Sequence, residues 1–322
     1  MANLVTTSPC SIAWLRYDQS NDVPSATPYF WQGQSLTWQI MARVNDDAYC
    51  LFGCAGSSLS LAQQTGISFT STRTLITLTA GSATFVLDFF SPVSLTDYVR
   101  QSIPYSYVRV EVQHQPRRST IDVLMAIDDT WTSQQPDTQA EFFKSWGGSL
   151  VFTLSGKNSY TWAENDNMAA WGNVVLAASS TAGSHVSYQV GRPEDIATQF
   201  KNNGTLIDDA TSYSSGDLVA LAYRLHGSLR HSSPSVTFAI GLEQENALNW
   251  LEEPQTGYYQ ATVSGTGNVV DHFFKDEAAA RVEGYALDKR VIDIGHQIST
   301  NYSDILESCV RQVSVPYPYN NQ

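Results

Sequence analysis

Residues 88–112, DFFSPVSLTDYVRQSIPYSYVRVEV, decide the fold, because two strand patterns flank a segment dense in turn and polar residues. The strand before it, residues 83–90, ends at Ser91-Pro92, where proline cannot continue a strand ladder. The strand after it, residues 105–112, alternates between two faces. One face carries Val108, Val110 and Val112, and the other carries Tyr105, Tyr107, Arg109 and Glu111. The alternation predicts a sheet with one core-facing side and one polar side.

Further strand patterns follow at short spacing, over residues 36–127 and again over residues 149–242. Turn residues separate them, as expected for hairpins in an antiparallel sheet. Between the two groups, from Asp128 to Ser145, the periodicity is lost. This stretch predicts a long loop that is either an active-site lid or a domain boundary.

After Thr266, apolar residues repeat at helical spacing, with Asp271 as the expected N-cap of a first helix. A second helical pattern covers residues 302–309, and an irregular tail follows it. The sequence therefore predicts a mainly β fold, an antiparallel β-sandwich with two C-terminal helices. The expected division is a β-sandwich domain at residues 1–265, with helices and tail packed on it at residues 266–322.

The composition limits the class of protein and its partners. The chain has 322 residues, a formal net charge of -13 and 15% charged residues, a balance typical of secreted or β-rich proteins. The negative charge argues against nucleic acid and anionic membranes as partners, because both would be repelled. No apolar run approaches the roughly 18 residues that a membrane span needs. The expected partners are small apolar or aromatic substrates, and the oligomeric state stays open.

The chain has four cysteines, which allow three pairings if all are bridged. Cys50 and Cys54 frame a short loop that a local disulfide could close, leaving Cys10 to meet Cys309. The alternative, that some or all of them are buried free thiols, carries equal weight.

Two Asn-x-Ser/Thr sequons begin at Asn203 and Asn301, which are candidate glycosylation sites. They fit passage through a secretory route. Residues 1–3, Met-Ala-Asn, do not form a signal peptide, so we expect a secreted mature form whose signal peptide is absent.

Two residues are candidates for acid–base chemistry. Asp129 follows Asp128 at the end of a strand and precedes Trp131, and a carboxylate desolvated there would have a raised pKa. The alternative is a pair of turn acids that accept backbone N–H bonds, the commoner use of strand-end aspartates. His272 near the expected helix start is the other candidate, with an exposed first-turn histidine as its alternative. Asp97 with Arg100 is interpreted as a buried ion pair that braces a turn.

Other kinds of chemistry have no motif. The sequence has no histidine cluster at metal-ligand spacing, no GxSxG and no nucleotide-binding glycine loop, so we expect neither metal nor cofactor. Aromatic residues near strand ends are the remaining signal, since aromatic walls with a few polar groups form most small-molecule sites. The candidate substrate-binding residues are Trp31, Gln34, Trp38, Trp131, Tyr258, Tyr259 and Phe274.

The run from Ser91 to Tyr107 resembles the N-terminal region of the large fungal glutaminase A-type proteins. Other segments agree with that region in order: Tyr29 to Gln34 with Trp38, Asp128 to Trp131, Tyr258-Tyr259, and Ala286-Leu287-Asp288. The resemblance spans nearly the whole chain but only the front part of the family. The long helical region that follows in those proteins has no counterpart here, so its contribution to glutamine hydrolysis cannot be carried over.

Three functions of different classes are compatible with these features. The favoured one is a cofactor-independent cyclase, because the sequence has no catalytic constellation for hydrolysis and is rich in aromatic residues. The chain also resembles stand-alone fungal hetero-Diels–Alderases that join a tropolone quinone methide to a humulene-type terpene. Holding two reactants in a near-attack pose can supply about 7–11 kcal/mol, and Gln34, Asp129 or His272 would orient the polar reactant. The alternatives are a non-catalytic front domain of a glutaminase A-like protein and a carbohydrate-binding β-sandwich.

Overall fold

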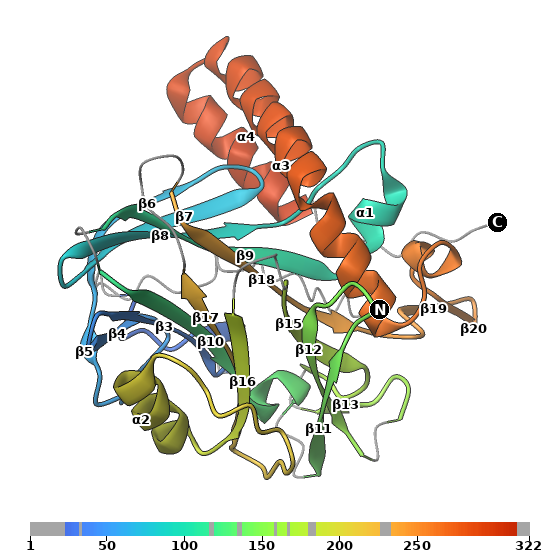
Figure 1. Ribbon diagram of the computed structural model, residues 1–322. Coiled ribbons are helices and arrows are strands. Elements are labelled where there is room, and N and C mark those ends of the chain that lie inside the picture. The colour runs from blue at the N-terminus through green and yellow to red at the C-terminus, as the bar shows by residue number, and fades with distance from the viewer. Residues whose placement is uncertain are drawn as a thin grey trace.

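Two large β-sheets packed face to face form the body of the protein, and helices lie on their outer faces (Figure 1). The computed structural model describes residues 23–31, 34–115, 119–133, 137–157, 160–165, 168–179, 185–225 and 233–313. The predicted mainly β fold, an antiparallel sandwich with two C-terminal helices, is confirmed.

The smaller sheet has six strands and is antiparallel except where β4 pairs with β5. Its strands, in spatial order, are β16 (His185–Gly191), β17 (Leu218–Leu225), β10 (Ile121–Ile127), β3 (Trp38–Val44), β4 (Asp47–Phe52) and β5 (Ser60–Leu61).

The larger sheet has eight antiparallel strands. They are, in spatial order, β11 (Thr138–Lys144), β12 (Leu150–Gly156), β15 (Asn173–Ala178), β18 (Ser235–Glu243), β9 (Tyr105–His114), β8 (Ala83–Phe90), β7 (Arg73–Ala80) and β6 (Gln63–Phe69). Three short ribbons lie outside both sheets: β1 (Tyr29–Trp31) with β2 (Gln34–Ser35), β13 (Glu164–Asn165) with β14 (Met168–Ala169), and β19 (Leu248–Trp250) with β20 (Glu253–Gln255).

Apolar side chains from both sheets fill the space between them. Val108, Val110 and Val112 of β9 are fully buried there, as their alternation predicts. Ile40 and Leu221 of the smaller sheet belong to the same cluster. Residues 88–112 therefore include the start of a central strand, β9, of the larger sheet.

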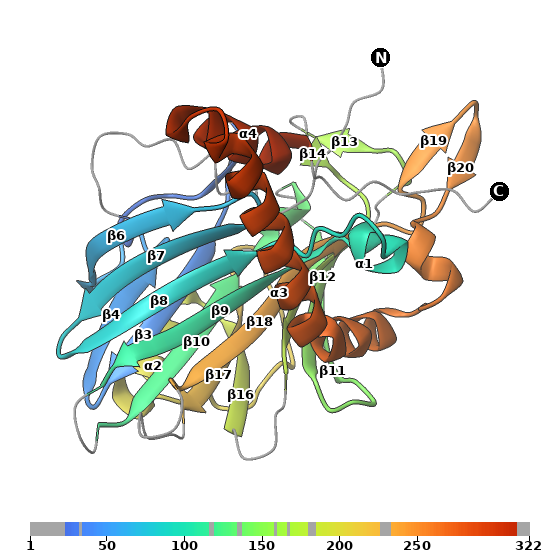
Figure 2. The ribbon, with the colours of Figure 1, turned by 90° about the horizontal axis from the view of Figure 1, so that it is seen from above.

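The opposite face of β9 is covered by α3 (Thr266–His296), which crosses the larger sheet (Figure 2). Tyr105 and Tyr107 are buried under this helix. The Tyr107 ring stacks on Phe273 with 3.8 Å between ring centroids, and its hydroxyl donates to the Phe273 carbonyl at 2.6 Å. The prediction of a polar face is therefore wrong for these two positions, because each phenol packs its ring under the helix and still finds a partner for its hydroxyl.

Two shorter helices complete the outer faces. The helix α2 (Pro193–Asn203) packs Ile196 and Phe200 on the outside of the smaller sheet and ends at Gly204, whose φ is 68°. The helix α4 (Thr300–Val313) lies against α3, and its Arg311 donates to the Arg73 carbonyl at 2.7 Å.

Two local predictions are wrong. Residues 128–145, expected to be one long loop, contain a 3-10 helix, η2 (Asp129–Thr132), and the edge strand β11. An edge strand pairs on one side only, so its sequence TQAEFFK lacks a clear alternation. The helix α3 begins at Thr266 and not at Asp271, whose carboxylate instead accepts hydrogen bonds from the β11–β12 turn at Ser145 Oγ (2.6 Å) and Gly147 N (2.6 Å).

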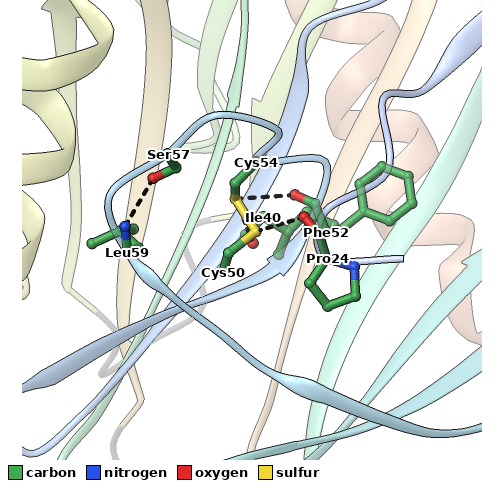
Figure 3. The surroundings of a disulfide bond; sticks show 7 residues. All are labelled: Pro24, Ile40, Cys50, Phe52, Cys54, Ser57 and Leu59. Atoms are coloured by element: carbon green, nitrogen blue, oxygen red, sulfur yellow. Dashed lines mark hydrogen bonds between the residues drawn. A yellow bond between two sulfur atoms is a disulfide. The ribbon is translucent and has the colours of Figure 1, made fainter. Parts of the chain in front are cut away.

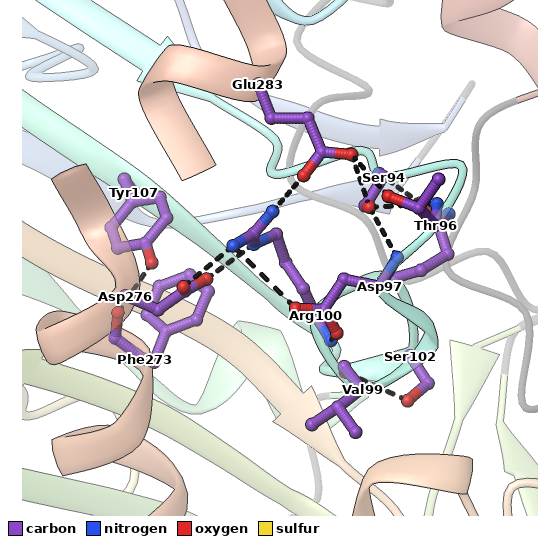
Figure 4. Close-up of polar contacts among 11 residues, drawn as sticks. Ser94, Thr96, Asp97, Val99, Arg100, Ser102, Tyr107, Phe273, Asp276 and Glu283 are labelled. Atoms are coloured by element: carbon purple, nitrogen blue, oxygen red, sulfur yellow. Dashed lines mark hydrogen bonds and ion pairs between the residues drawn. The ribbon is translucent and has the colours of Figure 1, made fainter. Parts of the chain in front are cut away.

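A short helix, α1 (Tyr98–Ser102), joins the segment between β8 and β9 to α3. Arg100 Nε donates to Asp276 Oδ2 at 2.5 Å, Nη2 donates to Asp276 Oδ1 at 2.8 Å, and Nη1 pairs with Glu283 (Figure 4). Asp97 lies 3.7 Å from Arg100 and caps α1, but its side chain is 44% exposed, so the prediction of a buried pair is wrong for Asp97. The main partners of Arg100 nevertheless lie on α3, about 180 residues further along the chain, beyond the reach of pattern analysis.

A disulfide joins Cys50 and Cys54, one of the pairings that the sequence allows (Figure 3). Both cysteines are buried in the cluster under α2. Cys309 on α4 is a free, exposed thiol, and Cys10 lies outside the described residues. Their pairing stays a prediction.

Replacing Cys50 and Cys54 together by alanine is expected to lower the free energy of unfolding by about 2 kcal/mol, the loop-closure value for a ring of roughly five residues. Urea unfolding of the oxidised wild type and of the double variant measures the difference. Cys309→Ala is the control and should change stability by less than about 0.5 kcal/mol. A double variant as stable as the control would contradict a stabilising role for this bridge.

Candidate functional site

A polar cleft of about 330 Å³ opens where β18 ends, next to the start of α3. Its walls come from the end of β18 with Gln244–Asn246, the loop before β15 with Trp171, the 3-10 helix η3 (Tyr258–Ala261) and the first turn of α3. This volume lies in the range of roughly 300–1,000 Å³ that is usual for small-molecule sites. Residues 161–173 and residues 243–269 thus meet around one space.

Two glycines allow these segments to approach one another. A Cβ on Gly241 of β18 would lie 2.0 Å from the Pro104 carbonyl oxygen, and a Cβ on Gly172 would lie 2.4 Å from the Glu243 carbonyl oxygen. Gly172 also has a φ of 102°, which favours glycine. Neighbouring backbone segments beside the cleft therefore approach each other more closely than a Cβ atom at either glycine would permit.

Glu243 is one of two glutamates in the wall of the cleft, with Glu245. Its Oε1 accepts a hydrogen bond from Tyr105 Oη at 2.5 Å, and its Oε2 accepts one from Thr266 Oγ1 at 2.5 Å. Burial raises the pKa of Glu243, although the hydrogen bonds from Thr266 and Tyr105 act in the opposite direction. A carboxyl group that is held from two sides and whose pKa is raised by burial is a candidate for function.

Side-chain amides tie the walls together. Gln260 Nε2 donates to the carbonyls of Gln244 (3.2 Å) and Glu245 (3.3 Å), and Gln244 Nε2 donates to the Trp171 carbonyl at 3.4 Å. The indole Nε1 of Trp171 donates to the Asn246 carbonyl at 3.3 Å. These contacts hold the rim in place and use donors that would otherwise face the cleft.

The raised pKa of Glu243 predicts a pH dependence of stability. The native state binds this proton more tightly than the unfolded chain, whose Glu pKa is about 4.3. The contribution of Glu243 to stability is therefore full below about pH 4.3 and is lost as the pH rises through the folded-state pKa. Urea unfolding at several pH values should show wild type losing stability relative to Glu243→Gln across that window. The exposed Glu141→Gln is the control, and parallel pH profiles for all three proteins would contradict the expectation.

The structure places one group of predicted site residues between the two sheets. Trp38 is 2% exposed and packs edge-to-face on Trp131, with ring centroids 5.5 Å apart. Asp129 Oδ2 accepts hydrogen bonds from Ser215 Oγ (2.5 Å) and Gly216 N (3.2 Å). Trp38 and Trp131 pack the core and Asp129 holds a loop, and these three residues are not among those that line the cleft.

The neighbouring Asp128 has the geometry of a turn acid. Its Oδ1 accepts hydrogen bonds from Thr130 N at 2.9 Å and Thr130 Oγ1 at 2.5 Å. Burial raises the pKa of Asp128, as expected for a desolvated carboxylate, while the bonds from Thr130 lower it. Asp128 therefore caps the η2 turn, whereas the Asp129 carboxylate holds the loop at Ser215 and Gly216. A catalytic role for Asp129 stays a prediction.

A second group of predicted residues lies outside the larger sheet. Tyr259 is buried and lines the cleft, and Tyr258 beside it packs edge-to-face on Tyr98. Phe274 is half-buried against the cluster under α3, and His272 is half-exposed on the second turn of that helix. Of this group only Tyr259 lines the cleft, and Asp129 and His272 lie on elements on opposite sides of the larger sheet.

Two further predicted residues lie on the first ribbon. Gln34 begins β2 and is half-buried, and Trp31 ends β1, with its side chain outside what the structure describes. Sequence reasoning missed Glu243 and Gln260 as site residues. Glu243 ends β18, so its place at the end of a strand was the available signal, whereas its contact with Thr266 was not foreseeable.

Three other expectations concern surface and ligands. Asn203 and Asn301 are both exposed, and their glycosylation stays a prediction. Within the described residues, no group of three or more histidine, cysteine or carboxylate side chains is placed to hold a metal ion. None of the described helices combines the length and apolar character of a membrane span.

Comparison with known proteins confirms the resemblance to the N-terminal region of glutaminase A-type proteins. The chain is 28% identical over 303 residues to Glutaminase A of Aspergillus oryzae, covering 89% of this chain and 43% of that protein. It is 26% identical over 229 residues to "Probable glutaminase/05536" of Arthroderma benhamiae, covering 63% of this chain and 25% of that protein. The chain thus spans less than half the length of either relative. Residues 72–293, which include every residue lining the cleft, match the family described as "Domain of unknown function (DUF5127)", and the chain belongs to that family.

Proposed function

We propose that this chain acts as the β-rich front domain of a glutaminase A-like protein and contributes a ligand-holding cleft rather than the hydrolytic centre. The observation that carries the proposal is the similarity to a named glutaminase along 89% of this chain, which accounts for only 43% of that protein. All residues that line the cleft at Glu243 lie within residues 72–293, the part of the chain that matches the family. We therefore assign to this cleft a role that is shared by the members of the family.

The side chains around the cleft support binding rather than hydrolysis. A nucleophilic mechanism needs a hydroxyl or thiol beside a base that a third group orients. Among the residues that the structure describes, no histidine lines the cleft, and Cys50, Cys54 and Cys309 are bridged or on α4. The Thr266 hydroxyl donates to Glu243, but Tyr105 holds the same carboxyl from its other side.

A chimera tests the front-domain proposal. The matching region of Aspergillus oryzae Glutaminase A is replaced by this chain, and ammonia release from glutamine is compared with that of the parent protein and of this chain alone. We expect the chimera to fold and to retain measurable activity, and this chain alone to show none. A folded but inactive chimera, together with ammonia release by this chain alone, would overturn the proposal.

A second candidate function is the cofactor-independent cyclase, a hetero-Diels–Alderase acting on a tropolone quinone methide and a humulene-type terpene. One observation favours it: burial raises the pKa of Glu243 at the wall of a cleft that Trp171 and Tyr259 also line. A carboxyl group kept neutral would donate a hydrogen bond to the heterodiene oxygen and polarise it in a site screened from water. The direction of this pKa shift is the one that this chemistry needs.

The cyclase candidate is tested by incubating the chain with a hydroxymethyl-tropolone precursor and humulene and measuring the enantiomeric excess of the adduct. An excess that Glu243→Gln abolishes and Glu141→Gln preserves would establish the candidate and assign Glu243. Racemic adduct formed at the rate of the protein-free control would reject it for these substrates.

We also propose that the protein is secreted. The buried Cys50–Cys54 bridge fits an oxidising compartment, where disulfides persist. The exposed sequons Asn203 and Asn301 fit the same route. Mass spectrometry of the protein from its source, before and after glycosidase treatment, tests this, and a carbohydrate-free protein with reduced Cys50 and Cys54 would contradict it.

A further inference from the structure

We propose that the cleft at Glu243 binds a small organic ammonium ion that carries no carboxylate of its own. This inference goes beyond the front-domain function, because it names the chemistry of the ligand and does not require glutamine hydrolysis by any part of a larger protein. Three features of the cleft support it: the hydrogen-bond acceptors that line it, its two aromatic side chains and its negatively charged groups.

The cleft offers acceptors, because its long amide side chains are turned toward protein carbonyls. Gln244 and Gln260 donate to backbone carbonyls of the rim, and Trp171 donates its indole N–H in the same way. Each Glu243 oxygen receives one hydroxyl hydrogen bond and keeps a second lone pair for a ligand. The exposed carboxylate of Glu245 lines the same space. A ligand rich in N–H donors matches this set.

Two aromatic side chains complete the match to a cation. Tyr259 and Trp171 both line the cleft, and the Trp171 ring packs edge-to-face on Trp162 with 5.3 Å between ring centroids. The Trp171 indole is therefore held by a ring contact and by its hydrogen bond to the Asn246 carbonyl. Ammonium groups are attracted to the faces of tryptophan and tyrosine rings. Fixed aromatic walls beside two carboxyl groups favour an alkylammonium ion over a neutral ligand.

Charge decides between ammonium ions with and without a carboxylate. Glu243 and Glu245 would both repel the carboxylate of a free amino acid, and the chain as a whole carries a formal net charge of -13. Free glutamine is thus disfavoured by the same groups that attract its ammonium. Amines and diamines gain the attraction without that repulsion.

Release of the Glu243 proton on binding would distinguish an ammonium ligand from the reactants of the cyclase candidate. Burial raises the pKa of Glu243, and a cation beside the carboxyl group would lower it again. Binding at a pH below the raised pKa should therefore release protons, and the fraction released should fall as the pH rises above that pKa. The cyclase candidate uses the neutral form of Glu243, so the direction of proton exchange separates the two.

Titration calorimetry of the full chain with 1,4-diaminobutane, and with the isosteric neutral 1,4-butanediol, tests the inference. The titrations are run at low salt, at about pH 5.5 and pH 7.5, in buffers of different ionisation enthalpy. We expect saturable binding of the diamine at least tenfold tighter than of the diol, with proton release larger at the lower pH. Equal affinity for the two ligands, or no binding of the diamine, would overturn the proposal.

Variants locate the site. Glu243→Gln should weaken diamine binding at least tenfold and remove the buffer dependence, whereas the matched exposed change Glu141→Gln, which does not line the cleft, should do neither. If Glu243→Gln fails to fold, Glu245→Gln at the exposed rim replaces it, with an expected loss of about threefold. Unchanged binding in every folded cleft variant would show that the diamine binds elsewhere and would overturn the assignment. The chimera reports separately on the front-domain function.

Discussion

Replacing Arg100 by alanine is expected to lower the free energy of unfolding by about 3 kcal/mol. Arg100 is 9% exposed in its side chain and pairs with Asp276 and Glu283, two turns apart on α3. Truncation leaves both carboxylates partly buried without this cation, and the cost of an uncompensated buried charge exceeds the value of the pair itself. The same change removes the link between α1 and the helix whose first turn lines the cleft.

Urea unfolding followed by circular dichroism measures this loss. Arg100→Lys should lose less than alanine but should not match wild type, because an ammonium cannot reproduce the guanidinium fork toward two carboxylates. The surface pair Lys289 and Asp293, four residues apart on α3, supplies the control. Lys289→Ala should cost less than about 0.5 kcal/mol. An Arg100→Ala variant no less stable than Lys289→Ala would contradict the account of how α3 is held.

Replacing Gly241 by alanine is expected to have a comparable effect, about 3 kcal/mol, because overpacking against backbone cannot be relieved by a side-chain rotation. The added Cβ would lie 2.0 Å from the Pro104 carbonyl oxygen and 2.5 Å from Tyr105 Cδ1. Strands β18 and β9 would have to separate where they pair at Gly241 and Tyr105. Since Tyr105 holds Glu243, the change should also disturb the cleft.

Gly66→Ala is the matched control for this second prediction. It is the same substitution in a strand of the same sheet, and its Cβ would meet only Thr77 atoms, the nearest at 3.8 Å. We expect a change of less than about 0.5 kcal/mol. Equal stabilities of the two variants in urea would show that β18 and β9 have more freedom than the close approach indicates.

The strands were predictable where hydrophobic alternation met turn residues. Strand β8 begins and ends where the sequence places it, at residues 83–90, because it has a buried face and an abrupt turn or loop at each end. The edge strand β11 was not predictable, since its exposed side relaxes the pattern. The start of α3 was misjudged because Asp271 is a good capping residue that here serves a different turn.

The candidate site was less predictable than the fold. Aromatic residues near strand ends were singled out as candidate substrate-binding residues, but a sequence does not tell which side of a sheet each one meets. Trp38 and Trp131 pack between the sheets, whereas Tyr259 reaches the cleft. The carboxyl group of Glu243 is held by hydrogen bonds from Tyr105 and Thr266, which lie on β9 and α3. Such a group is found only once the register of β9 against β18 is known.

Ammonia release from L-glutamine by the purified chain tests most directly the claim that this domain binds a ligand and does not hydrolyse it. Wild type and Glu243→Gln are assayed in parallel, with Aspergillus oryzae Glutaminase A as the positive control. The account predicts ammonia at the protein-free rate for both forms of this chain. Repeated turnover by wild type that Glu243→Gln abolishes would contradict it and would make the cleft an active site.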